Sequence, residues 1–109
     1  MSVTQKLDHD VVINYPSYGD ITFKSIYSLH SHWCRDAEKQ TKKWWAENIQ
    51  EDWNILDIGS HVGMYAALFC QKAPHGKIFC FEPTDTRHLL ETNMASLGVK
   101  NCTIYPMRS

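Results

Sequence analysis

Two glycines and two carboxylates form the pattern with the clearest chemistry in this sequence. Gly59 and Gly63 follow an apolar run that ends at Ile58, Asp57 lies two residues before Gly59, and Glu82 lies 19 residues after Gly63. A glycine at a strand end lets the chain turn tightly into a helix, and a second at the helix start permits close packing. An acidic residue at the end of the next strand can accept hydrogen bonds from both hydroxyls of a ribose. The pattern predicts a nucleoside site beside the N–H donors of a helix N-terminus.

The residue between the glycines distinguishes two classes of nucleoside ligand. Dinucleotide sites use G-x-G-x-x-G, in which the middle glycine lets the backbone approach a pyrophosphate. His61 stands at that position here and carries a Cβ and a ring. The spacing D-x-G-x-x-x-G suits a ligand with ribose hydroxyls, no phosphate and a charged amino-acid tail, such as S-adenosylmethionine. Asp57 would hold the ammonium group of that ligand, directly or through water, or would cap the following helix.

A strand–helix rhythm is expected to position this pattern. Apolar runs predict three strands, at residues 53–58, 78–81 and 102–105. Between them we expect a helix over 64–72 and a second helix that Thr84 or Asp85 caps and Gly98 ends. The order β-α-β-α-β with short links predicts a parallel sheet with right-handed crossovers. Because residues 53–58 are nearly all apolar, we expect this strand to be covered on both faces.

Residues 1–52 are expected to form a β-hairpin and a helix that lead into the unit formed by residues 53–109. Residues 11–13 and 21–29 predict the strands of the hairpin, and a helical period begins after Asp36, its predicted N-cap. The apolar face of this helix comprises Ala37, Thr41, Trp44, Trp45 and Ile49. The tryptophan pair is expected to lie in the core and cover the sheet. The solvated face is expected to comprise Arg35, Lys39, Lys42 and Lys43.

Three segments carry a more specific pattern. They are Leu56-Asp57-Ile58-Gly59-Ser60-His61-Val62-Gly63-Met64-Tyr65, Phe81-Glu82-Pro83-Thr84 and Leu90-Glu91-Thr92-Asn93-Met94. Together they resemble the FkbM family of S-adenosylmethionine-dependent methyltransferases, which typically shows D-x-G-A-N-x-G-x-Y, then F-E-P, then a helix ending near L-x-x-N. The resemblance covers residues 53–106, about half of the chain.

The resemblance implies S-adenosylmethionine as the cofactor and a hydroxyl oxygen of a small molecule or sugar as the methyl acceptor. The candidate cofactor-binding residues are Asp57, Gly59, Ser60, His61, Gly63 and Glu82. Ser60 and His61 replace the usual Ala-Asn of the family, which changes the local ligand contacts. Asn93 is expected to be structural, bonding back to loop backbone. No residue can be nominated as the catalytic base.

The implied fold is α/β, with the first half of a Rossmann-like class I methyltransferase sheet preceded by a hairpin and a helix. Such a sheet binds its ligand where the strand order reverses, between two halves, and this chain supplies only the first. The chain is therefore expected to be incomplete at its C-terminus and inactive alone. Without a fourth strand, residues 53–58 would form an apolar edge, through which self-association is expected.

Length and composition exclude other classes. The chain has 109 residues, enough for one domain, and its formal net charge of −1 argues against a nucleic-acid or membrane surface. With no apolar export signal, we expect a cytoplasmic protein with reduced thiols. His30, His32 and Cys34 would share one face of a strand, but no fourth ligand is nearby and no metal site is expected. The alternatives are a nicotinamide-dependent oxidoreductase fragment and a non-catalytic Rossmann-like binding fragment.

Overall fold

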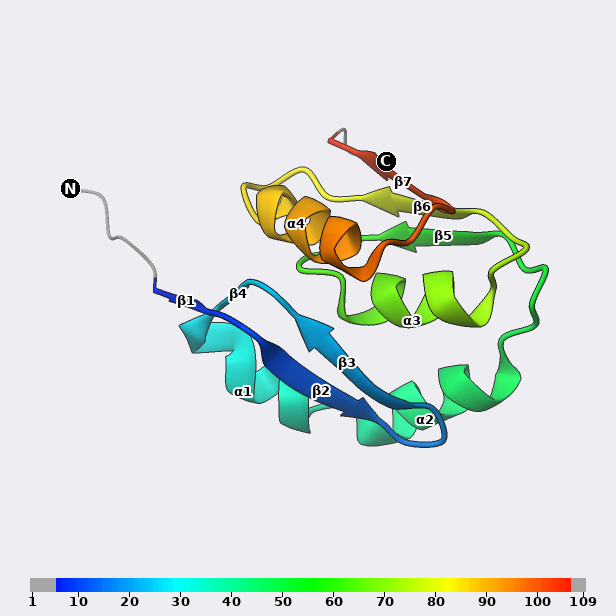
Figure 1. Ribbon diagram of the computed structural model, residues 1–109, viewed down its shortest axis with the longest axis horizontal. Coiled ribbons are helices and arrows are strands. Elements are labelled where there is room, and N and C mark those ends of the chain that lie inside the picture. Colours follow the sequence, from blue (N-terminus) through cyan, green and yellow to red (C-terminus); the bar gives the residue numbers. More distant parts are fainter. Residues whose placement is uncertain (1–5, 107–109) are drawn as a thin grey trace.

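The computed structural model describes residues 6–106, arranged as Figure 1 shows. In chain order the elements are β1 (Leu7–Asp8), β2 (Val11–Tyr15), β3 (Gly19–Phe23), β4 (Ile26–Tyr27), α1 (Ser28–Asp36), α2 (Lys39–Asn48), β5 (Ile55–Ile58), α3 (Met64–Lys72), β6 (Ile78–Phe81), α4 (Arg87–Leu97) and β7 (Cys102–Tyr105). Within these residues no helix has the length and apolar character needed to cross a membrane.

A parallel sheet with the strand order β5-β6-β7 positions the predicted site. Ile58 aligns with Phe81, and Phe81 with Tyr105, so the three carboxyl ends lie at one edge of the sheet. The connecting helices α3 and α4 lie on the same face (Figure 1), as two right-handed crossovers in one direction require. The predicted β-α-β-α-β unit and its α/β class are confirmed.

The opposite face of this sheet is open, so the prediction that β5 is covered on both faces was wrong. Leu56 is 60% exposed and Ile58 is 58% exposed. Phe81 and Tyr105, aligned with Ile58 across the sheet, stack on each other with ring centroids 4.9 Å apart. Both helices pack on the other face, and no element of the described chain covers this one.

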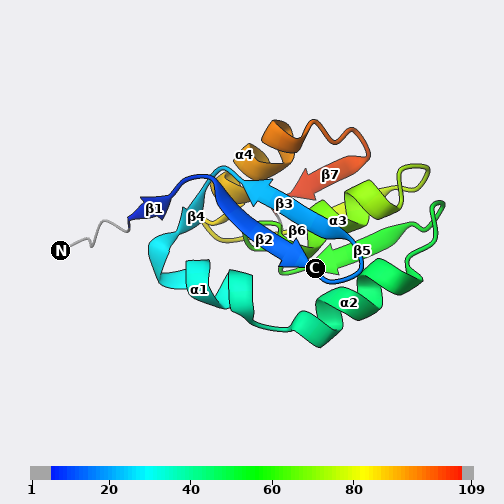
Figure 2. The ribbon, with the colours of Figure 1, turned by 60° about the horizontal axis from the view of Figure 1, so that its bottom comes forward.

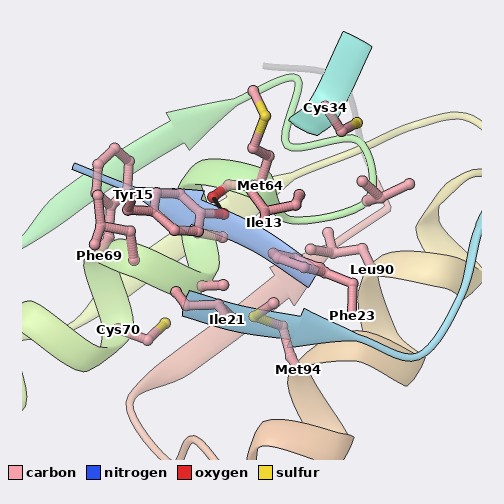
Figure 3. Packing of buried hydrophobic residues seen from close by; sticks show 14 of the residues in the cluster. Ile13, Tyr15, Ile21, Phe23, Cys34, Met64, Phe69, Cys70, Leu90 and Met94 are labelled. Carbon is pink, nitrogen blue, oxygen red and sulfur yellow. Dashed lines mark hydrogen bonds between the residues drawn. The ribbon is translucent and has the colours of Figure 1, made fainter. Parts of the chain in front are cut away.

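The predicted hairpin is confirmed as the antiparallel pair β2 and β3. Its inward residues Ile13, Tyr15 and Phe23 are fully buried, and they pack with residues of α3 and α4 on the side away from the sheet (Figure 3). The hydroxyl of Tyr15 donates to the carbonyl oxygen of Met64 at 2.5 Å. Desolvation by burial raises the pKa of Tyr15. Hairpin, helices and sheet therefore form successive layers around one core.

Residues 24–36 depart from the prediction of a strand that continues to Leu29. The hairpin ends at Phe23, β4 pairs with β1, and helix α1 follows directly (Figure 2). The only buried residues of α1 are Ser31 and Cys34, so this short helix offers few apolar positions from which a helical period can be read. The next helix, α2, begins at Lys39, and the residue before it is Glu38 in a left-handed conformation rather than an Asp36 cap.

Lys42 is fully buried, which corrects its predicted place on a solvated face. Its Nζ donates to the carbonyl oxygen of Cys34 at 2.6 Å and lies 5.8 Å from the centre of the Tyr15 ring. A cation is favourable at the C-terminal carbonyls of a helix. Lys42 therefore caps α1 and ties it to α2 and the hairpin. Desolvation lowers the pKa of Lys42.

Trp45 of α2 packs against the core, as predicted, but the predicted cover of the sheet was wrong, because Trp45 contacts a helix and Trp44 is largely exposed. Trp45 makes an edge-to-face contact with Phe69 of α3, with centroids 5.1 Å apart. Trp44 is 53% exposed. The helices α2 and α3 therefore meet through this aromatic contact.

All four cysteines are free thiols, and Cys34, Cys70 and Cys80 are buried, as the apolar-thiol prediction requires. The sulfur atoms of Cys80 and Cys102, on neighbouring strands, lie 3.7 Å apart. Burial raises the pKa of Cys34, so the buried thiol is disfavoured as a nucleophile.

Candidate functional site

The loop between β5 and α3, residues 59–63, turns at the carboxyl edge of the sheet. Gly59 has a φ of 76°, which favours glycine over any residue with a Cβ. Its N–H donates to the carbonyl oxygen of Phe81 at 2.8 Å, so the turn is tied to the end of the neighbouring strand. Gly59 is therefore required for the turn, as predicted from its position.

Gly63 permits a close contact, but with a different partner from the one expected. Its φ is 101°, and a Cβ here would lie 2.7 Å from Cε of Met94 and 3.0 Å from Cδ1 of Leu90. Both neighbours belong to α4, so the glycine allows α3 to start against that helix rather than against a strand. The absence of a side chain at Gly63 thus allows the close approach of α3 and α4.

Glu82 is buried, with 2% of its surface exposed, and its carboxylate holds the loop. Oε1 accepts a hydrogen bond from the backbone N–H of His61 at 2.8 Å. Oε2 accepts from the N–H of Thr84 at 3.1 Å and from its hydroxyl at 2.5 Å. Burial alone would raise the pKa of Glu82, but the bonds from Thr84 and His61 hold it below its usual value. Glu82 is ionised and joins the end of β6 to the β5–α3 loop.

Asp57 carries an oxygen with an unsatisfied hydrogen-bonding capacity. Its Oδ2 is buried and has no hydrogen-bond partner within the described chain. Desolvation raises the pKa of Asp57, although the nearby Ser60 hydroxyl and His61 ring act in the opposite direction. The hydroxyl of Ser60, itself buried, donates to the backbone carbonyl oxygen of Asp57 at 3.0 Å. A buried carboxylate oxygen without a donor is suited to receive an ammonium group from a ligand.

A pocket of about 260 Å³ brings most of the predicted residues together. Asp57, Gly59, Ser60 and His61 line it, whereas Gly63 and Glu82 do not. Gly63 and Glu82 instead hold the β5–α3 loop in place, Gly63 by its close contact with α4 and Glu82 by its hydrogen bond from His61. Sequence reasoning missed the remaining walls of this pocket, which are His30, Trp33 and Cys34 of α1, Val62, Met64, Tyr65 and Thr86.

Spacing could have revealed the α1 wall. His30, Trp33 and Cys34 stand at positions i, i+3 and i+4, which share one face of a helix. The expectation that His30, His32 and Cys34 share a strand face was wrong, because the segment is helical. In residues 6–106 no three His, Cys, Asp or Glu side chains are grouped so that they could hold a metal ion.

A larger depression, of about 700 Å³, lies at the opposite end of the sheet. It is lined by residues 49–52 before β5, by Gln71 and Lys72 in the last turn of α3, and by Pro74 and His75 after that helix. It is open and contains none of the predicted site residues. The 260 Å³ pocket is the better candidate because it joins the unsatisfied Asp57 carboxylate to the glycine turn.

Asn93 stabilises the loop from the side of α4, which confirms its predicted structural role. The side chain is fully buried. Its Nδ2 donates to the carbonyl oxygens of Ser25 at 3.0 Å and Val62 at 2.9 Å, and its Oδ1 accepts from the N–H of Ser25 at 2.9 Å. One amide therefore joins α4, the β5–α3 loop and the segment after the hairpin.

Comparisons with known proteins support the fold. No protein-family model and no curated protein match the sequence. Among solved structures, a proposed transferase from Pyrococcus horikoshii superposes on 91% of this chain and 37% of its own, at 14% identity and a TM-score of 0.60. A SAM-dependent methyltransferase from Aquifex aeolicus superposes on 68% of this chain and 38% of its own, at 22% identity and a TM-score of 0.51.

A third solved structure, coclaurine N-methyltransferase bound to N-methylheliamine and S-adenosylhomocysteine, superposes on 54% of this chain, at 17% identity and a TM-score of 0.50. The chain covers between 18% and 38% of the length of these three proteins. At such identities the likeness shows a shared fold. The described chain has the Rossmann-like α/β arrangement found in class I methyltransferases.

Proposed function

We propose that this chain is the cofactor-binding half of an S-adenosylmethionine-dependent methyltransferase of the FkbM type, with a hydroxyl oxygen of a small molecule or sugar as the acceptor. The observation that carries the proposal is the buried, unpartnered Oδ2 of Asp57 in a pocket beside the Gly59 turn. The fold shared with solved methyltransferases supports it.

Each residue of the motif has a separate part in this proposal. Asp57 accepts a charge-assisted hydrogen bond from the ammonium group of the cofactor through Oδ2, which has no other partner. Gly59 lets the backbone turn at a φ of 76°, and the space next to its Cα is open, so a ligand can approach the backbone there. Ser60 and His61, which follow Gly59, also line the pocket.

Glu82 takes part in the ribose site by exchanging the hydroxyl bond from Thr84 for one from the ligand. Its other oxygen would keep the bond to the N–H of His61, so the loop would stay in place. The bound cofactor supplies an electrophilic methyl group on a sulfonium sulfur. This chain contributes by positioning that group, which is how in-line transfer between bound reactants is accelerated.

Calorimetric titration tests the proposal, with S-adenosylmethionine, S-adenosylhomocysteine and NAD as ligands. We expect the first two to bind and NAD not to bind, because His61 with its Cβ stands where a pyrophosphate would approach. Asp57→Asn removes the charge with little change in shape and should weaken both ligands by roughly ten- to a hundredfold. Asp20→Asn, on the exposed side of the hairpin, is the matched control and should change nothing. Unchanged affinity in Asp57→Asn, or tight binding of NAD, would contradict the proposal.

A labelled-methyl assay addresses the acceptor. The 109-residue chain alone should transfer no label, because it supplies one half of the site. Label transferred by this chain to an amine acceptor would contradict two parts of the proposal: that the chain alone is inactive, and that the acceptor is a hydroxyl oxygen.

A further inference from the structure

Helix α1 forms a wall of the candidate pocket although it lies outside the β-α-β-α-β unit. Its residues His30, Trp33 and Cys34 face the pocket together. Figure 3 shows Cys34 at the end of α1 beside the loop that enters α3. The buried ammonium group of Lys42 fixes that end of α1 through the 2.6 Å bond to the carbonyl oxygen of Cys34. The buried Lys42 of α2 therefore holds this α1 wall of the pocket in place.

The pocket combines a carboxylate with aromatic rings. Asp57, whose Oδ2 has no hydrogen-bond partner, lines it together with the aromatic side chains of Trp33 and Tyr65. No lysine or arginine is among the described residues that line it. A carboxylate attracts a cation through Coulomb interaction, and the face of an aromatic ring does so through its quadrupole, most strongly for tryptophan. These features favour a positively charged ligand group.

The volume of the pocket limits which part of a cofactor it can take. At about 260 Å³ it is smaller than the ~300–1,000 Å³ typical of pockets that enclose a drug-sized molecule. It therefore suits one half of S-adenosylmethionine. The half that matches its lining is the aminoacyl end, which carries the ammonium, the sulfonium and one carboxylate, and therefore a net charge of +1.

We infer that the pocket takes this cationic half and that Trp33 favours the charged sulfonium of S-adenosylmethionine over the neutral thioether of S-adenosylhomocysteine. The inference rests on the proposed function, because it assigns a specificity to the same site. Trp33 is suited to the role because the residue is 55% exposed and lies outside the buried core. A ring in this position would discriminate the methyl donor from the product left after transfer.

Titration with three ligands and two matched variants tests the inference. The ligands are S-adenosylmethionine, S-adenosylhomocysteine and sinefungin, in which a carbon bearing an amine replaces the methylsulfonium. Trp33→Leu should weaken the two charged ligands about three- to thirtyfold more than the neutral thioether. Trp44→Leu is the control, because Trp44 is 53% exposed on α2 and does not line the pocket. It should leave all three affinities unchanged.

Equal weakening of the three ligands by Trp33→Leu, or no weakening, would overturn the inference while leaving the proposed function intact. Failure of the wild-type chain to bind any of them would overturn both. Thermal unfolding of each variant shows whether it folds. If Trp33→Leu does not fold, Trp33→Phe replaces it, and the selectivity for the charged ligands should then decrease by a smaller factor; an unchanged ratio would overturn the inference.

Discussion

Replacing Glu82 with alanine should destabilise the fold as well as impair binding. The carboxylate accepts three hydrogen bonds, from the N–H of His61 and from the N–H and hydroxyl of Thr84. Hydrogen bonds to charged groups contribute about 1.5–3 kcal/mol each. Water can reach exposed His61 and Thr84 once the carboxylate is removed, which offsets part of the loss. We therefore expect Glu82→Ala to lower the free energy of unfolding by about 2–4 kcal/mol.

Urea denaturation at pH 7 measures this loss. With a slope of about 1–2 kcal/mol/M, the midpoint should fall by roughly 1–4 M. Glu91→Ala is the matched control, because Glu91 forms only an exposed 3.2 Å ion pair with Arg87 and should cost less than about 0.5 kcal/mol. Glu82→Gln keeps an acceptor for the N–H of His61 but loses the charge. Its loss of unfolding free energy should lie between the losses of Glu82→Ala and Glu91→Ala.

The pH dependence provides a second check on Glu82. Its hydrogen bonds lower the pKa in the folded state below the ordinary value of 4.5. The stabilisation is therefore present above that pH and is lost as the pH falls through the folded-state pKa. The difference between wild type and Glu82→Gln should shrink in acid. A Glu82→Ala midpoint equal to that of wild type at pH 7 would refute this reasoning.

Three other changes have expected outcomes. Asp57→Asn should raise stability at pH 7, because burial raises the pKa of Asp57 and its ionised form disfavours folding above the ordinary value of 3.8; an unfolding midpoint below that of wild type would argue against this. Asn93→Ala removes three buried hydrogen bonds and should cost roughly 2–4 kcal/mol in urea denaturation, whereas a loss under about 1 kcal/mol would not fit. The 109-residue chain should associate with increasing concentration in sedimentation, and Ile58→Lys should reduce this while Val12→Lys, on the hairpin, does not; a monomer at every concentration would contradict self-association through β5.

The β-α-β-α-β unit could be predicted from sequence because its signals are local. Short apolar runs mark β5, β6 and β7, and Gly98 ends α4 in the left-handed conformation that its position indicates. The turn at Gly59 and the structural role of Asn93 also follow from residue type and spacing. These features depend on neighbours within one or two elements.

The parts that could not be predicted depend on tertiary contacts. Helix α1 buries only Ser31 and Cys34, so the spacing of His30, Trp33 and Cys34 was the main local signal for it, and which element that face meets depends on packing. The burial of Lys42 depends on its meeting the last carbonyls of α1. The bonds of Glu82 to Thr84 and His61 depend on how the two loops pack, which spacing along the sequence does not indicate.

Nuclear magnetic resonance with ¹⁵N-labelled protein tests the central claim, that the pocket beside the Gly59 turn binds the cofactor. Titration with S-adenosylhomocysteine should shift the amide signals of Gly59 and His61 and the indole N–H of Trp33, all of which belong to the pocket lining. The indole N–H of Trp44 and the amide of His75, at the opposite depression, should stay in place. Shifts confined to His75 and its neighbours, or no shifts at saturating ligand, would contradict the account.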